Sequence, residues 1–161
     1  MSSIHVHSER SARTGIAIVW PCWFPGSVDP ELHATALFLG NTDTVDFTKE
    51  EVEEALGRYL WPAWTQSKGF SLFGANHDIP VLVLEHTNLL TITRDDIKRR
   101  LFNRGIRAND QFDFIPHVTV AKEIAGGAYR PSEVHLESPV LWWGDERVLH
   151  TEHAKQKAKA A

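Results

Sequence analysis

Two short segments of this 161-residue chain carry a histidine and a threonine two positions apart. The first is His33-Ala-Thr35 within HATALFLG, and the second is His117-Val-Thr119 within PHVTVAKE. Side chains two apart on a β-strand point to the same face, about 7 Å apart along it. If both segments are strands, each presents an imidazole and a hydroxyl on one face, and the intervening apolar residue faces the core.

This pattern suits the cleavage of a phosphodiester without a metal. The reaction needs a base to deprotonate the nucleophile and an acid to protonate the leaving oxygen, and two imidazoles can supply both near neutral pH. A hydroxyl beside each imidazole can bind the phosphate oxygens and hold the phosphorus between the rings. We therefore predict that His33 and His117 are catalytic and that Thr35 and Thr119 bind phosphate. The alternative is two half-buried histidines that are hydrogen-bonded to local partners.

The elements that must position these residues follow from the hydrophobic pattern. Thr48 and Glu51 form a capping box that begins one helix, and Pro62 ends it. A second helix is expected to start near Thr93 and to stop at Gly105. Strands are expected at 15–20, 32–40, 70–74, 81–86, 114–122 and 139–150, the last with a turn at Gly144.

These elements divide into two similar halves, each with strands, one helix and one motif strand. An α+β fold with antiparallel sheets is the natural class for such a chain. We expect one domain at 14–150, between a flexible arm at 1–13 and a flexible tail at 151–161. The residues of the motif strands that are expected to fill the core are Leu32, Ala34, Ala36, Phe38, Val118 and Val120.

The motifs and the order of the elements resemble the two-histidine (2H) phosphoesterase superfamily, in its LigT-like 2′-5′ RNA ligase and cyclic phosphodiesterase group. The resemblance covers roughly 15–150 and includes LHATALFLG, with its trailing Phe-Leu-Gly, and PHVTVAK. It implies a bilobal fold with two antiparallel sheets related by pseudo-twofold symmetry, helices on the outside and a V-shaped central groove. It also implies hydrolysis of 2′,3′-cyclic, 2′-5′ or other cyclic phosphodiesters. In phages, relatives destroy cyclic oligonucleotide immune signals.

The resemblance further implies basic residues near the motifs. The position three residues after the second threonine holds Lys122, which keeps a positive charge but lacks the bidentate fork of arginine. The position two residues after the first threonine, which is often basic in the family, holds Leu37. Lys122 is therefore a further candidate for phosphate binding.

Aromatic and basic residues outside the motifs offer further candidates. Six tryptophans are many for this length, and an exposed ring can stack on a nucleobase. Trp23, in a Pro- and Gly-containing loop before the first motif, and Trp143 are the candidates for stacking, with core packing as the alternative. A basic run is interpreted as a solvated helix face: Arg94, Lys98, Arg99, Arg100, Arg104 and Arg107.

Composition bounds the remaining possibilities. A net charge of -4 argues against a partner such as long nucleic acid, but it permits a small nucleotide or RNA-end substrate. There is no long apolar run, no secretory signal and only one cysteine, Cys22, and no cluster has metal-ligand spacing. We therefore expect a cytoplasmic monomer that needs no metal or other cofactor and binds no membrane. The alternative function is an RNA- or nucleotide-binding module that keeps the fold without turnover.

Overall fold

The computed structural model describes residues 13–57, 59, 61–109 and 113–148. The predicted arm and tail therefore lie outside the described residues, apart from Arg13. The elements, in chain order, are β1 (Gly15–Trp23), β2 (His33–Asn41), α2 (Lys49–Leu56), β3 (Ala63–Phe73), β4 (Ile79–Leu84), α3 (Asn88–Phe102), β5 (His117–Thr119), α4 (Lys122–Ala125), β6 (Glu133–Leu136), β7 (Val140–Trp143) and β8 (Glu146–Val148).

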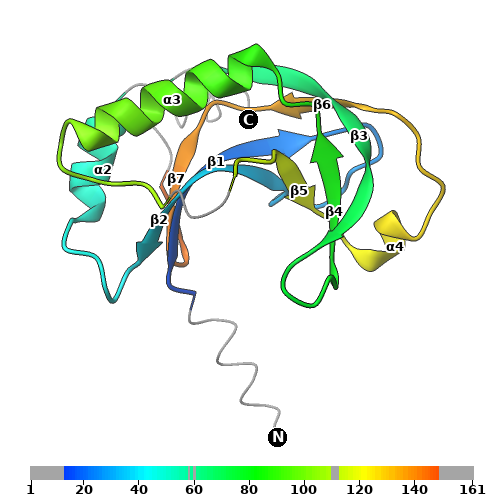
Figure 1. The fold of residues 1–161 in the computed structure, drawn as a ribbon, viewed down its shortest axis with the longest axis horizontal. Helices are drawn as coiled ribbons and strands as arrows, with labels where there is room; N and C mark the ends of the chain where they lie inside the picture. The colour runs from blue at the N-terminus through cyan, green and yellow to red at the C-terminus, as the bar shows by residue number, and fades with distance from the viewer. Residues whose placement is uncertain (1–12, 58, 60, 110–112, 149–161) are drawn as a thin grey trace, which may run out of the picture.

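The fold is α+β, as predicted, and every described strand pair is antiparallel. The strands join into one eight-stranded sheet in the order β2-β5-β4-β3-β6-β1-β7-β8, and β1 also pairs with β2. The strands from β2 to β1 in this order therefore close into a ring, and β7 and β8 continue the sheet from β1. Figure 1 shows α3 with α2 at one of its ends, on the far side of the molecule from the β3–β4 turn. No helix in the described part of the chain is long and apolar enough to cross a membrane.

The predicted capping box at the start of α2 is confirmed. The Thr48 hydroxyl accepts a hydrogen bond from the Glu51 N–H, and the Glu51 carboxylate accepts one from the Thr48 N–H. The start predicted for the second helix was wrong, because α3 begins at Asn88 with Thr87 as its N-cap. Thr93 lies instead within the helix and is buried, so it cannot cap a helix end.

A bulge in β2 changes which side chains reach the core. Val19 and Ile18 of β1 pair with Thr35 and Leu37, so Ala36 is an extra residue on β2 and the alternation of faces reverses beyond it. The prediction that Phe38 fills the core was therefore wrong: its side chain is 40% exposed, and Leu37 is buried in its place. The other predicted core residues are buried as expected: Leu32, Ala34, Ala36, Val118 and Val120.

Two stretches of sheet carry no clear apolar pattern and were not predicted. β6 was missed, and β3 begins at Ala63, well before the predicted strand at 70–74. The first half of β3 buries polar side chains, because the Thr65 hydroxyl donates to the Glu85 carbonyl and the Ser67 hydroxyl bonds to Tyr129. β5 is shorter than the predicted strand, and Lys122 begins the short helix α4 rather than ending a strand.

Candidate active site

The two motif strands, far apart in the sequence, are neighbours in the sheet. Ala34 of β2 pairs with Val118 of β5 in antiparallel register. Both side chains are 0% exposed, so they fill the core on one face of this strand pair. The residues on either side of them must point to the other face.

This register brings the four motif residues together. Counting outward from the Ala34–Val118 pair, His33 lies opposite Thr119 and Thr35 lies opposite His117. Directly opposite side chains share one face, with Cβ atoms about 5 Å apart. Each histidine therefore faces the threonine of the other motif, and the two imidazoles lie on one diagonal. We call these residues the motif quartet.

The backbone holds both imidazoles in the same way. His33 Nδ1 lies 2.9 Å from the Glu31 carbonyl oxygen, and His117 Nδ1 lies 2.7 Å from the Ile115 carbonyl oxygen. A carbonyl only accepts, so Nδ1 carries the hydrogen and Nε2 of the neutral ring has a lone pair. No hydrogen bond joins either Nε2 to another residue in the described ranges. Both Nε2 atoms are thus available to exchange a proton with a ligand.

An aromatic ring packs against each imidazole. Trp142 of β7 lies 4.0 Å from His33 between ring centroids, with an interplanar angle of 52°. Phe73 of β3 lies 4.7 Å from His117, with an angle of 57°. Because carbonyl and aromatic ring together restrict each imidazole, the sheet preorganises both side chains before a substrate binds.

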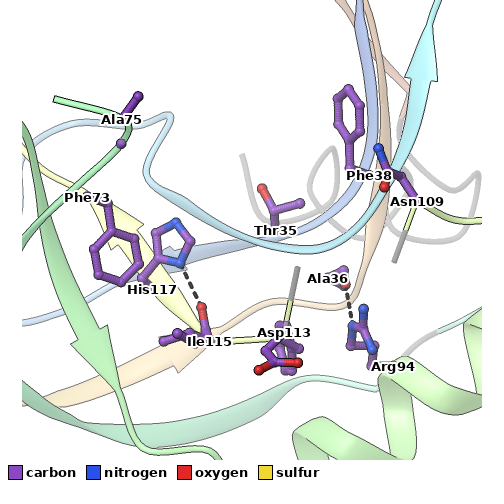
Figure 2. A pocket seen from close by; sticks show the side chains of 12 residues that line it. Thr35, Ala36, Phe38, Phe73, Ala75, Arg94, Asn109, Asp113, Ile115 and His117 are labelled. Atoms are coloured by element: carbon purple, nitrogen blue, oxygen red, sulfur yellow. Dashed lines mark hydrogen bonds between the residues drawn. The ribbon is translucent and has the colours of Figure 1, made fainter. Parts of the chain in front are cut away.

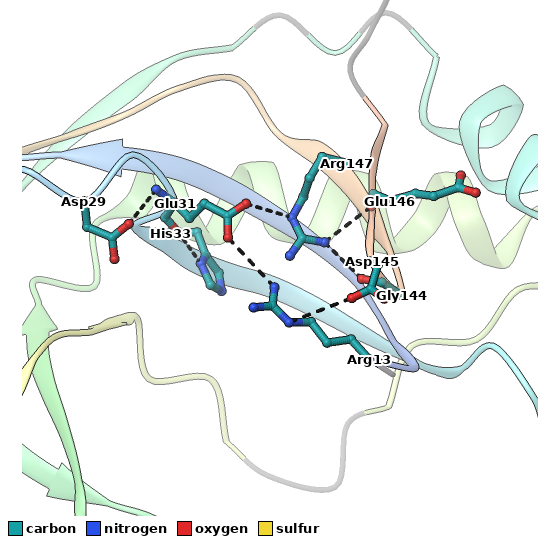
Figure 3. A network of polar contacts seen from close by, with 8 residues as sticks. All are labelled: Arg13, Asp29, Glu31, His33, Gly144, Asp145, Glu146 and Arg147. Atoms are coloured by element: carbon teal, nitrogen blue, oxygen red, sulfur yellow. Dashed lines mark hydrogen bonds and ion pairs between the residues drawn. The ribbon is translucent and has the colours of Figure 1, made fainter. Parts of the chain in front are cut away.

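Charged residues surround His33 (Figure 3). The Arg147 guanidinium lies 3.8 Å from the Trp142 ring centroid, and its Nε lies 3.5 Å from the Glu31 carboxylate. Arg13 lies 3.8 Å from the other oxygen of the same carboxylate. Burial is the largest cause that lowers the pKa of His33, and the charges of Arg147 and His117 lower it further, against the opposing carbonyl and carboxylate of Glu31. His117 is therefore close enough to His33 to disfavour a positive charge on it.

A cavity of about 900 Å³ opens beside one half of the motif quartet. Thr35 and His117 project into it from neighbouring strands, whereas His33 and Thr119 are not among the lining residues (Figure 2). Three further polar side chains line the cavity, those of Arg94, Asn109 and Asp113. The rest of its walls are apolar or glycine: Ala36, Phe38, Phe73, Gly74, Ala75, Phe114 and Ile115. Such a cavity can hold an aromatic ring next to the quartet.

Arg94 is a lining residue that the interpretation of the sequence missed. Its Nε donates to the Ala36 carbonyl at 2.8 Å, and its guanidinium lies 4.7 Å from the centroid of Phe114. Placing it on a solvated helix face was therefore wrong. It stands four residues after the buried Leu90 and three before the buried Ile97, on the apolar side of α3, and this spacing was the available signal. Several other members of the basic run form ion pairs with acidic residues of α2 or α3.

Three other candidates from the sequence lie away from this cavity. Lys122 is exposed at the start of α4. Trp23 is 48% exposed, and its ring stacks on His135 at 4.1 Å between centroids. Trp143 is half-buried, with its ring 6.1 Å from that of Phe47. The aromatic rings that line the cavity are instead phenylalanines.

The single cysteine does not add a nucleophile to the site. Cys22 is buried, and its burial, with the nearby charge of Glu137, raises its pKa to about 12. It therefore remains a protonated thiol at neutral pH. Among the described residues, no group of three or more His, Cys, Asp or Glu side chains is placed to hold a metal ion.

The sequence matches no protein-family model, and it matches no curated protein sequence. The motif quartet and the adjoining cavity are therefore the basis on which a function can be assigned.

Proposed function

We propose that this protein is a metal-independent phosphodiesterase of the 2H type. It hydrolyses a cyclic or 2′-5′ phosphodiester in a small RNA end or a cyclic mono- or oligonucleotide. The observation that carries the proposal is the Ala34–Val118 register, because it sets two imidazoles and two hydroxyls on one face of the sheet.

The chemistry follows from this arrangement. With the phosphorus at the centre of the quartet, the neutral imidazole accepts a proton from the attacking water at Nε2, and the protonated imidazole donates one to the leaving oxygen. The hydroxyls of Thr35 and Thr119 donate hydrogen bonds to the non-bridging oxygens, where negative charge accumulates in the transition state. The carbonyls of Glu31 and Ile115 hold each ring with Nε2 toward the substrate.

The proposal includes a bilobal arrangement with pseudo-twofold symmetry about the Ala34–Val118 pair. Its support is local and has three parts. β2 is flanked by β1 as β5 is flanked by β4, each histidine bonds to the carbonyl two residues before it, and each packs against an aromatic ring. The cavity then forms one end of the central groove that the resemblance implies.

The cavity supports a nucleotide as the substrate class. Sites for small ligands typically measure about 300–1,000 Å³ and combine apolar walls with a few polar groups. This cavity lies within that range, and it contains three phenylalanine rings that can pack against a nucleobase. Thr35 and His117 place the phosphodiester at its edge.

The test is hydrolysis of 2′,3′-cyclic nucleotides, 2′-5′ oligonucleotides and 3′-5′ cyclic mono- and oligonucleotides in the presence of EDTA. We expect turnover of at least one substrate, and a loss of about 10²- to 10⁴-fold in each of His33→Ala and His117→Ala. His135→Ala is the matched control, because that imidazole lies on β6 outside the cavity. Near-wild-type rates in either motif variant would refute the proposal. Binding without any turnover would favour a nucleotide-binding module instead.

A further inference from the structure

The two imidazoles of the quartet share the same kind of backbone contact and aromatic packing, but they differ in whether a charged group also contacts the packed ring. The Arg147 guanidinium covers the Trp142 ring on which His33 rests. In the described part of the chain, no guanidinium or ammonium group lies over Phe73, the ring that packs against His117. The pair is therefore electrostatically unequal.

We propose that Arg147, stacked on Trp142, makes His33 the general base of the pair and leaves His117 as the general acid. This inference rests on the proposed phosphodiesterase activity and assigns the direction of proton transfer within it. Arg147 does not touch the reacting atoms, so it is a positioning residue.

The geometry disfavours a positive charge on His33. A protonated His33 would stand near the guanidinium, because both groups pack against the Trp142 ring, and like charges in a partly buried site repel. Glu31 opposes this effect, but its carboxylate is shared between Arg147 and Arg13. Arg13 in turn lies 3.9 Å from Asp145, and across the strand pair His117 is the other group that can be charged.

The proposed step balances as a hydrolysis. Neutral His33 takes a proton from water at Nε2 as the water oxygen bonds to phosphorus. The bond from phosphorus to the leaving oxygen breaks, and that oxygen takes the Nε2 proton of His117. The two imidazoles end with their protonation states exchanged, and proton exchange with solvent restores them.

A change of leaving group tests the assignment directly. A p-nitrophenyl phosphodiester releases p-nitrophenolate, which departs without a proton, so the general acid becomes dispensable. We expect His117→Ala to lose less than about tenfold on this substrate but about 10²- to 10⁴-fold on a ribose leaving group, whereas His33→Ala is impaired on both. The reverse pattern would overturn the assignment.

The role of Arg147 is tested by titrating His33 by NMR and by the pH profile of kcat/KM. In Arg147→Gln the Glu31 carboxylate stays charged, so the pKa of His33 should rise and the acidic limb should move to higher pH. Glu31→Gln should lower the pKa of His33 and move the acidic limb to lower pH. Arg147→Lys should give the wild-type profile, because lysine keeps the positive charge. Arg104→Gln, which removes an ion pair with Glu54 of α2, is the control and should change neither the titration of His33 nor the pH profile.

The outcomes separate the two proposals. Turnover with an unchanged titration of His33 in Arg147→Gln would overturn the role of Arg147 alone. Movement of the alkaline limb instead of the acidic limb would identify His33 as the general acid and overturn the base assignment. Absence of turnover on every substrate would refute the phosphodiesterase activity, and the base assignment with it.

Discussion

Removing the two threonine hydroxyls tests whether the quartet holds a phosphate. Thr35→Val and Thr119→Val keep the shape of each side chain and remove one donor. A hydrogen bond to a charged group is worth about 1.5–3 kcal/mol, which corresponds to a loss of about 10- to 150-fold in kcat/KM per variant. The fold should be little affected, since Thr35 is half-buried at the cavity and Thr119 is exposed. Neither hydroxyl forms a hydrogen bond with another described residue, so valine leaves no orphaned partner.

The assay combines steady-state kinetics with urea unfolding of the same samples. The expected change in unfolding free energy is below about 0.5 kcal/mol, as for most surface substitutions. Thr44→Val is the matched control, because that threonine lies in a turn outside the cavity, and it should keep full activity. If the motif variants lose stability in proportion to activity, the hydroxyls are structural. If activity is unchanged, no phosphate lies between them.

Further outcomes follow from the same geometry. Activity should persist in EDTA with a bell-shaped pH profile, and loss in chelator with recovery in manganese would contradict the two-histidine mechanism. Phe38→Ala should raise KM more than it lowers kcat, whereas an unchanged KM would place the nucleobase outside the cavity. Thr48→Ala should lower the unfolding free energy by about 1 kcal/mol without changing kcat/KM, as measured by urea unfolding. The pKa of His33 is lowered in the folded state, so this residue should stabilise the fold above its ordinary pKa of 6.5 and lose that contribution as the pH falls. The resulting pH dependence of the unfolding free energy should be absent in His33→Gln.

The features that the sequence predicts well are local ones. The capping box at Thr48 needs residues three positions apart, and the facing of His33 and Thr35 needs only the period of a strand. β6 could not be predicted in the same way. It is four residues long, and it forms because β1 and β3, which are distant in the sequence, pair with its two edges.

The cavity walls depend on two features that alternation alone does not reveal. Phe38 reaches the cavity because Ala36 is an extra residue in β2, and no apolar pattern marks a bulge at that position. Arg94 reaches it because α3 begins earlier than predicted, at Asn88, and turns that side chain toward β2. An arginine in a basic run is ordinarily solvated, so composition pointed away from its place at the site.

The chemistry of the quartet depends on a single register, and the core determines that register. A shift of one residue between β2 and β5 would send Ala34 or Val118 to the polar face and bury an imidazole in its place. The small Ala34 side chain opposite the branched Val118 leaves no room for a larger group, because both are fully enclosed. Selection for tight packing beneath the strand pair is therefore also selection for the positions of His33 and His117 above it.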